Sequence, residues 1–145
     1  MWSFETIVDT VTNSYLEAAV WSSLDHNIVD EHGNSPDLSE RYRISDFTDE
    51  SYDKAKADCK RFLELLKATP CDGCTDLYEA AIWMTCESEV GHDFWLTRNG
   101  HGAGFWDGDY DEYGDAICEV LYAEFGRYNE FNIWADVSGK LHLEG

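Results

Sequence analysis

The sequence has few basic residues, few prolines and no long apolar run. Lys and Arg number 10 against 30 Asp and Glu, which gives a formal net charge of −20. A charge this negative repels nucleic-acid phosphates and anionic membranes, so we expect direct binding to neither. Two prolines in 145 residues exclude a proline-rich linker. No stretch approaches the roughly 20 apolar residues of a membrane span.

Sequence signatures of catalysis are also scarce. The chain contains no P-loop, no dinucleotide-binding fingerprint and no nucleophile elbow. The cysteines number five, an odd set, and the first residues lack the basic and apolar regions of a signal peptide. We therefore expect a cytoplasmic protein. The leading interpretation assigns no catalytic residue, no cofactor and no metal ligand.

The apolar residues are numerous enough for a folded core. Hydrophobic residues make up 43% and aromatic residues 14% of the chain, which favours a folded protein over a disordered one. The length fits one acidic domain over residues 1–145. Capping residues and apolar spacing predict four helices, at about residues 12–22, 48–69, 75–90 and 113–125.

Two hairpins are predicted beside these helices. In the first, residues 93–97 and 103–107 are strand-like and flank an Asn-Gly turn. In the second, residues 131–136 and 140–143 alternate in polarity around a Ser-Gly turn. The predicted fold class is therefore α+β, with about four helices packed on a small antiparallel sheet built from two hairpins.

The run from Gly91 to Asp107, GHDFWLTRNGHGAGFWD, closely resembles a motif of small acidic proteins encoded by many bacteriophages. The similarity extends more loosely to residues 15–23, 57–59 and 136–143, and so spans most of the chain. It implies a phage or prophage origin and carries no established chemistry. The predicted order of helix, aromatic hairpin, helix and strand also looks like that of plasmid antirestriction proteins.

The acidic residues gather in two parts of the chain. Residues 1–40 hold eight acids and no Lys or Arg, and residues 68–145 hold sixteen acids and three bases. Carboxylates four residues apart on a helix repel each other unless a partner neutralises them. The predicted partner-binding residues are Asp107, Asp109, Asp111, Glu112, Asp115 and Glu119, with Trp106 and Tyr110 as aromatic anchors and Asp72, Asp76 and Glu79 as secondary candidates.

These features favour a phage-encoded inhibitor or modulator of a basic host protein. Helix neighbours lie about 5–6 Å apart, so a row of carboxylates can imitate a phosphate backbone. The expected target is a nucleic-acid-binding or defence protein of the restriction, nuclease, CRISPR or transcription class. Binding by nucleic-acid mimicry would take place in the cytoplasm of an infected host cell.

Two other classes of function stay open. A small metal-dependent or enzymatic domain could centre on the aromatic hairpin, where His92, Asp93, His101 and Asp107 are permissible ligands. Stoichiometric metal in the purified protein would favour that reading. A phage structural or regulatory protein, acidic only for solubility, is the third class. Charge reversal over residues 107–119 without loss of function would favour it.

Three isolated features have less support. Cys71 and Cys74 form a CxxC pair, but a zinc ribbon needs a second pair and a redox motif normally follows a strand. Cys86 could add a third thiolate, although we expect it deep inside the third helix. Arg98 is expected to pair with Asp93 or Asp107.

Overall fold

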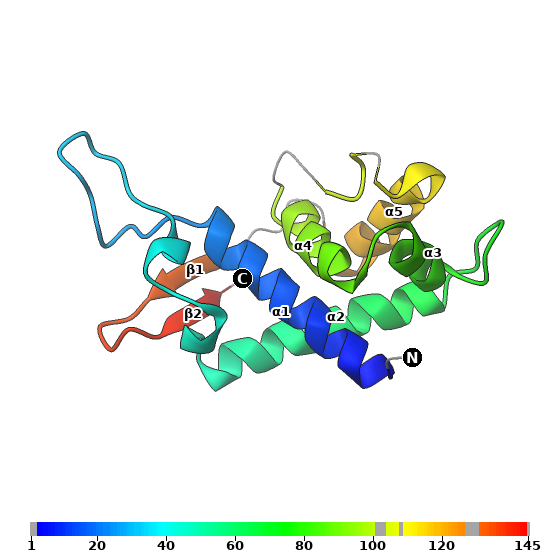
Figure 1. Cartoon of the computed structure of the whole chain (residues 1–145), viewed down its shortest axis with the longest axis horizontal. Coiled ribbons are helices and arrows are strands. Elements are labelled where there is room, and N and C mark those ends of the chain that lie inside the picture. Colours follow the sequence, from blue (N-terminus) through cyan, green and yellow to red (C-terminus); the bar gives the residue numbers. More distant parts are fainter. Residues whose placement is uncertain (1–2, 101–103, 108, 127–130, 145) are drawn as a thin grey trace.

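A computed structural model describes residues 3–100, 104–107, 109–126 and 131–144. In that part of the chain, five α-helices and three short 3-10 segments accompany one two-stranded antiparallel sheet. The molecule is elongated, with the sheet at one end and α3 and α5 at the other (Figure 1). The elements are α1 (Phe4–Ser22), η1 (Leu38–Glu40), η2 (Ile44–Asp46), α2 (Asp49–Lys67), α3 (Leu77–Met84), α4 (Glu87–Arg98), η3 (Asp111–Tyr113), α5 (Gly114–Phe125), β1 (Asn132–Ala135) and β2 (Leu141–Glu144).

The mixed α and β composition is thus confirmed, while the number of helices and hairpins differs from the prediction. None of the helices in the described segments has both the length and the apolar character that a membrane span requires.

Helix α1 begins well before the predicted start near Thr12. Ser3 is its N-cap, and the Ser3 hydroxyl accepts a hydrogen bond from the Thr6 N–H at 3.2 Å. Thr12 does not cap anything, because its hydroxyl donates to the Val8 carbonyl within the helix at 2.7 Å. A threonine in mid-helix commonly bonds back in this way. The predicted start of this helix near Thr12 is therefore wrong.

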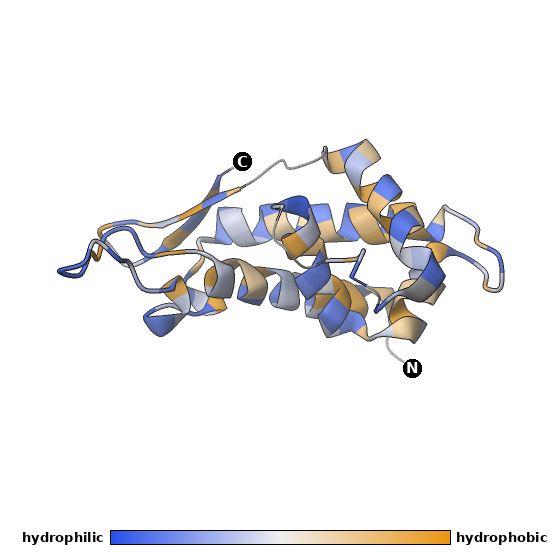
Figure 2. Ribbon diagram, turned by 90° about the horizontal axis from the view of Figure 1, so that it is seen from above, coloured by the Kyte–Doolittle hydropathy of each residue, from blue (hydrophilic) through white to orange (hydrophobic). Residues whose placement is uncertain are grey.

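Helix α2 agrees with its prediction. Thr48 is the N-cap, and its hydroxyl accepts the Ser51 N–H at 3.1 Å. Figure 2 shows hydrophobic and hydrophilic residues alternating along the helices, as amphipathic packing requires. The buried face of α2 follows the apolar spacing that predicted this helix, and it comprises Ser51, Ala55, Cys59, Phe62, Leu63 and Leu66.

The largest correction concerns residues 75–107. The predicted third helix is two helices, α3 and α4, and Gly91 lies inside α4 instead of ending it. Residues 93–97, predicted as the first strand, are also helical, so the prediction of a first hairpin is wrong. Its predicted returning strand, residues 103–107, begins at residue 103, which lies outside the described residues together with turn residues 101 and 102. Phe105 nevertheless returns to the end of α4, since its N–H donates to the Thr97 hydroxyl at 3.0 Å.

The interior explains why α4 escaped detection. Val90, Gly91 and residues 93–98 are all buried, so almost every side of the helix faces protein. A helix buried all round has no polar face and hence no amphipathic period in its sequence. The ring of Phe94 stacks on Phe62 of α2 at 4.3 Å and on Tyr15 of α1 at 5.0 Å between ring centroids. Phe94 therefore joins three helices in one core.

Arg98 does not make the predicted pair with Asp93 or Asp107. It is only 5% exposed, and its Nη1 lies 2.7 Å from Asp58 Oδ2 of α2. Nη1 also donates to the Tyr15 hydroxyl at 3.3 Å, and the guanidinium lies 4.2 Å from the ring centroid of Phe131. This ion pair links the C-terminal end of α4 to α2.

The C-terminal hairpin is confirmed in position and in the orientation of its faces. Strand β1 pairs with β2, Ile133 lies opposite Leu143, and both Ile133 and Ala135 face the core. In the turn, Asp136 Oδ1 accepts hydrogen bonds from the N–H groups of Ser138 at 2.9 Å and Lys140 at 3.0 Å. These bonds fix the chain reversal.

Asp136→Asn is expected to destabilise the protein at neutral pH. Bonds from Ser138 and then His142 hold the Asp136 pKa well below its usual range. A depressed pKa in the folded state stabilises the fold above the unfolded pKa, and this stabilisation is lost as the pH falls through the folded value. The variant should lose a few degrees of Tm at pH 7, and the difference from wild type should shrink below about pH 4. Thermal unfolding followed by circular dichroism measures both. A difference independent of pH would show that the charge on Asp136 does not matter.

Candidate functional site

The predicted acidic residues before and along α5 are largely on the surface. Asp107, Asp109, Glu112, Asp115 and Glu119 are all exposed, whereas the side chain of Asp111 lies outside the described ones. In the described segments, none of these five forms an ion pair with a Lys, Arg or His. Their negative charges are therefore available to a partner.

Helix α5 orients the last two of these carboxylates by its amphipathic pattern. Ile117 and Leu121 are buried, while Asp115 and Glu119 point outward one turn apart. The helix ends at Gly126, whose φ of 85° is readily adopted only by glycine. The helix thus ends where the predicted helix at about residues 113–125 ends, and Asp115 and Glu119 lie on its exposed face.

The two aromatic anchors separate in the structure. Trp106 is 41% exposed and directly precedes the exposed Asp107 in the chain. Tyr110 is fully buried, packs edge-on against Phe105 at 4.9 Å between ring centroids, and donates a hydrogen bond to Asp93 at 2.7 Å. Tyr110 is a core residue in this structure and offers no surface to a partner, so it leaves the candidate set.

The secondary acids lie at two different clefts. Asp72 lies with Glu112 and Tyr113 at a cleft of about 440 Å³, and the Tyr113 hydroxyl donates to the Asp72 carbonyl at 2.8 Å. Asp76 and Glu79 lie at another cleft. Asp76 is the N-cap of α3, because its side chain accepts the Glu79 N–H at 2.8 Å. Asp72 therefore extends the surface around Glu112, whereas Asp76 has a structural role.

The CxxC pair forms a tight turn beside the first cleft. The backbones of Cys71 and Cys74 form an isolated antiparallel β-bridge, and the Sγ atoms of these free cysteines lie 2.6 Å apart. Burial, followed by the effect of Cys74, raises the pKa of Cys71 to about 11. A thiol with a raised pKa holds little thiolate at neutral pH. Cys86 is the N-cap residue of α4. The prediction that it lies deep inside a helix is therefore wrong.

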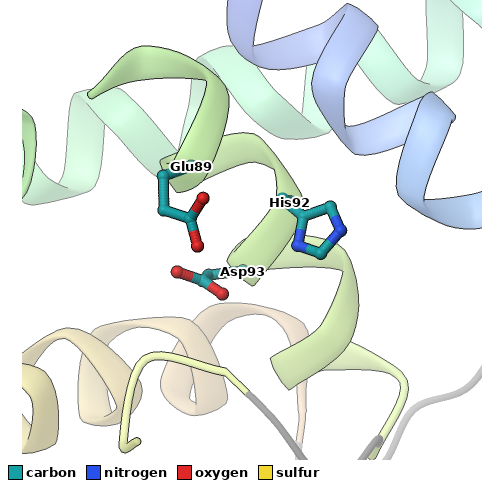
Figure 3. A group of neighbouring side chains, drawn as sticks. All are labelled: Glu89, His92 and Asp93. Carbon is teal, nitrogen blue, oxygen red and sulfur yellow. The ribbon is translucent and has the colours of Figure 1, made fainter. Parts of the chain in front are cut away.

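A group of potential metal ligands lies on α4. Glu89, His92 and Asp93 place their ligand atoms within 4.8 Å of one another. Figure 3 shows the carboxylates of Glu89 and Asp93 facing each other, with the His92 ring beside them. His92 and Asp93 were predicted as permissible ligands, but Glu89 was not, because residues 93–97 were expected to form a strand and not to continue the helix of Glu89. His101, the other predicted histidine, lies outside the described residues.

Asp93 is the most perturbed carboxyl of this group. It is 2% exposed, and burial raises its pKa to about 7. The hydrogen bond from Tyr110 lowers the Asp93 pKa, while the charges of Glu89, Asp107 and Asp109 raise it. Asp93 thus faces several carboxylates and has no Lys or Arg partner in the described segments.

The structure thus contains exposed acids on and before α5 and a partly buried Glu-His-Asp group on α4. No protein-family model, no curated protein and no solved structure matches the chain.

Proposed function

We propose that the protein binds a basic, nucleic-acid-binding protein of a bacterial host and blocks its nucleic-acid site. The observation that carries the proposal is the exposure of Asp107, Asp109, Glu112, Asp115 and Glu119, none of which is ion-paired in the described residues. Acids without internal partners destabilise the folded chain by mutual repulsion. A basic groove that normally holds phosphates would relieve this repulsion.

The charge distribution supports electrostatic steering towards such a target. The formal net charge is −20, and charge complementarity raises association rates and selects partners. Arg41, Lys56, Arg61 and Arg98 each pair with an internal carboxylate. These cations are therefore less available to repel a basic partner.

The resemblance to small acidic phage proteins supports an infected cell as the setting. In that setting the target would be a restriction, nuclease, CRISPR-type or transcription protein. Trp106, exposed beside the acids, is the proposed aromatic anchor, since tryptophan often dominates the energy of an interface.

The test begins with capture from bacterial lysate on the immobilised full-length chain at low salt. Proteins released by a salt gradient are identified by mass spectrometry, and each is tested for competition between this chain and duplex DNA. A captured protein that binds DNA and releases it to this chain supports the proposal. Capture that is insensitive to salt, or that DNA does not compete, contradicts it.

A matched pair of variants then tests the surface. In the first, Asp107, Asp109, Glu112, Asp115 and Glu119 become Asn or Gln. Each of these acids is expected to form one exposed ion pair with the partner, worth about 0.5 kcal/mol. Removal of all five should therefore lower the affinity for the captured protein by roughly 100-fold. The control removes the same charge elsewhere by converting five other exposed acids to amides, namely Glu17, Glu31, Asp37, Glu40 and Asp53.

Titration calorimetry at several salt concentrations compares the two variants. The control should lose less than about fivefold, because its acids act only through the distant field of the molecule. Equal losses in both variants would mean that net charge, and not this surface, determines binding. No loss in either would favour acidity that serves solubility alone.

A further inference from the structure

The Glu89, His92 and Asp93 group combines features that a carboxylate cluster alone lacks. The three residues follow each other at i, i+3 and i+4, so α4 places them on one side of a single turn. Their ligand atoms lie within 4.8 Å of one another (Figure 3). One ligand is an imidazole, which suits Zn²⁺ and other first-row transition metals better than Mg²⁺ or Ca²⁺.

Asp93 provides the second observation. It is 2% exposed, and its Oδ2 accepts a hydrogen bond from Tyr110 at 2.7 Å. Its carboxylate faces that of Glu89 (Figure 3). Buried carboxylates are normally paired with a cation or bound to a metal. In the described segments no Lys or Arg forms an ion pair with Asp93.

Two of the three ligands, His92 and Asp93, contact aromatic side chains of neighbouring segments. The His92 ring lies 5.5 Å from the Trp21 ring of α1, between centroids. The Tyr110 hydroxyl orients the Asp93 carboxylate through the hydrogen bond that it donates to Oδ2. Residues that fix the orientation of ligands in this way are a general feature of metal sites.

We propose that Glu89, His92 and Asp93 bind one divalent first-row transition-metal ion. Water completes the coordination, since three protein ligands leave open positions. The ion offsets the mutual repulsion of the Glu89 and Asp93 carboxylates, whose ligand atoms lie within 4.8 Å of each other. The ligands of this site lie on α4, and its test needs no partner.

Mn²⁺ is the probe of choice, because Cys71 and Cys74 offer thiols that Zn²⁺ would also bind. The full-length protein is first treated with a chelator and then titrated with Mn²⁺ in physiological KCl and excess Mg²⁺. Mg²⁺ occupies surface carboxylates that attract any divalent ion. Electron paramagnetic resonance measures the free Mn²⁺, and the expected result is one bound ion per chain.

Variants identify the ligands. Glu89→Gln and His92→Gln should each weaken Mn²⁺ binding by at least about tenfold, because each removes one of three protein ligands. The control carries Glu31→Gln and His32→Gln, an exposed Glu-His pair 3.5 Å apart, and should bind Mn²⁺ as wild type does. Pulsed resonance on the wild-type complex should also detect coupling of Mn²⁺ to an imidazole nitrogen.

Each of three results would overturn the proposal. Loss of saturable binding in excess Mg²⁺ would show that only surface carboxylates attract the ion, and would overturn the proposal. Unchanged binding by His92→Gln would do the same. If that variant does not fold, as judged by circular dichroism, the absence of nitrogen coupling in the wild-type protein would still overturn it.

Discussion

Gly91→Ala is expected to destabilise the protein by about 3 kcal/mol or more, the cost of forcing extra volume into a packed contact. Gly91 lies where α4 crosses α1. A Cβ at this position would overlap the Val11 carbonyl oxygen and lie 2.9 Å from the Ser14 Cβ. The obstacle is largely backbone, so it cannot turn aside as a flexible side chain would. The Ser14 hydroxyl also donates to the Ser88 carbonyl across the same contact.

The sign of this effect distinguishes packing from helix propensity. Inside a helix, alanine is favoured over glycine by about 1 kcal/mol, so propensity alone predicts stabilisation. Urea unfolding of Gly91→Ala should instead show a large loss. Ser88→Ala in the same helix, at an exposed position, should change stability little. If Gly91→Ala proves more stable than wild type, the close approach of α1 and α4 is wrong.

Asp58→Ala is expected to cost about 3 kcal/mol, because it leaves the buried guanidinium of Arg98 without its charge partner. Arg98 Nη1 lies 2.7 Å from Asp58, and the side chain of Arg98 is 6% exposed. Its Nε already lacks a hydrogen-bond partner in the described residues. Removal of Asp58 would leave the Tyr15 hydroxyl and the aromatic rings as the described contacts of this buried cation.

A second ion pair provides the matched control. Lys56 and Asp9 lie 2.9 Å apart but are 36% and 51% exposed, so Asp9→Ala should cost less than about 1 kcal/mol. The double variant Arg98→Met with Asp58→Leu should recover much of the loss, because it removes both charges. Chemical unfolding measures all three. Equal effects of Asp58→Ala and Asp9→Ala would show that burial does not strengthen the dependence on Asp58.

The aromatic motif shows why part of the fold could not be predicted. Asn99-Gly100 follows the end of α4, and Gly100 has a φ of 70°. The turn signal was therefore correct, but it ends a helix and does not join two strands. Phe94 and Trp95 favour strands by propensity. Packing of Phe94 between Phe62 and Tyr15 outweighs that preference.

The candidate sites divide in the same way. The exposure of Asp115 and Glu119 follows from their alternation with buried Ile117 and Leu121, and the sequence predicted that helix. The burial of Tyr110 and the grouping of Glu89 with Asp93 depend on α4, which the sequence did not predict. Local spacing cannot reveal which side chains a fully buried helix brings together.

By itself, the sequence determined the acidity, helices α2 and α5 and the C-terminal hairpin, because caps, amphipathic periods and turn residues act locally. Tertiary structure alone decided the path of residues 87–98, the pairing of Arg98 with Asp58, and the meeting of Glu89, His92 and Asp93. The physical reason is burial. A helix enclosed by its neighbours is stabilised by packing between distant segments, and that information is spread over the whole chain.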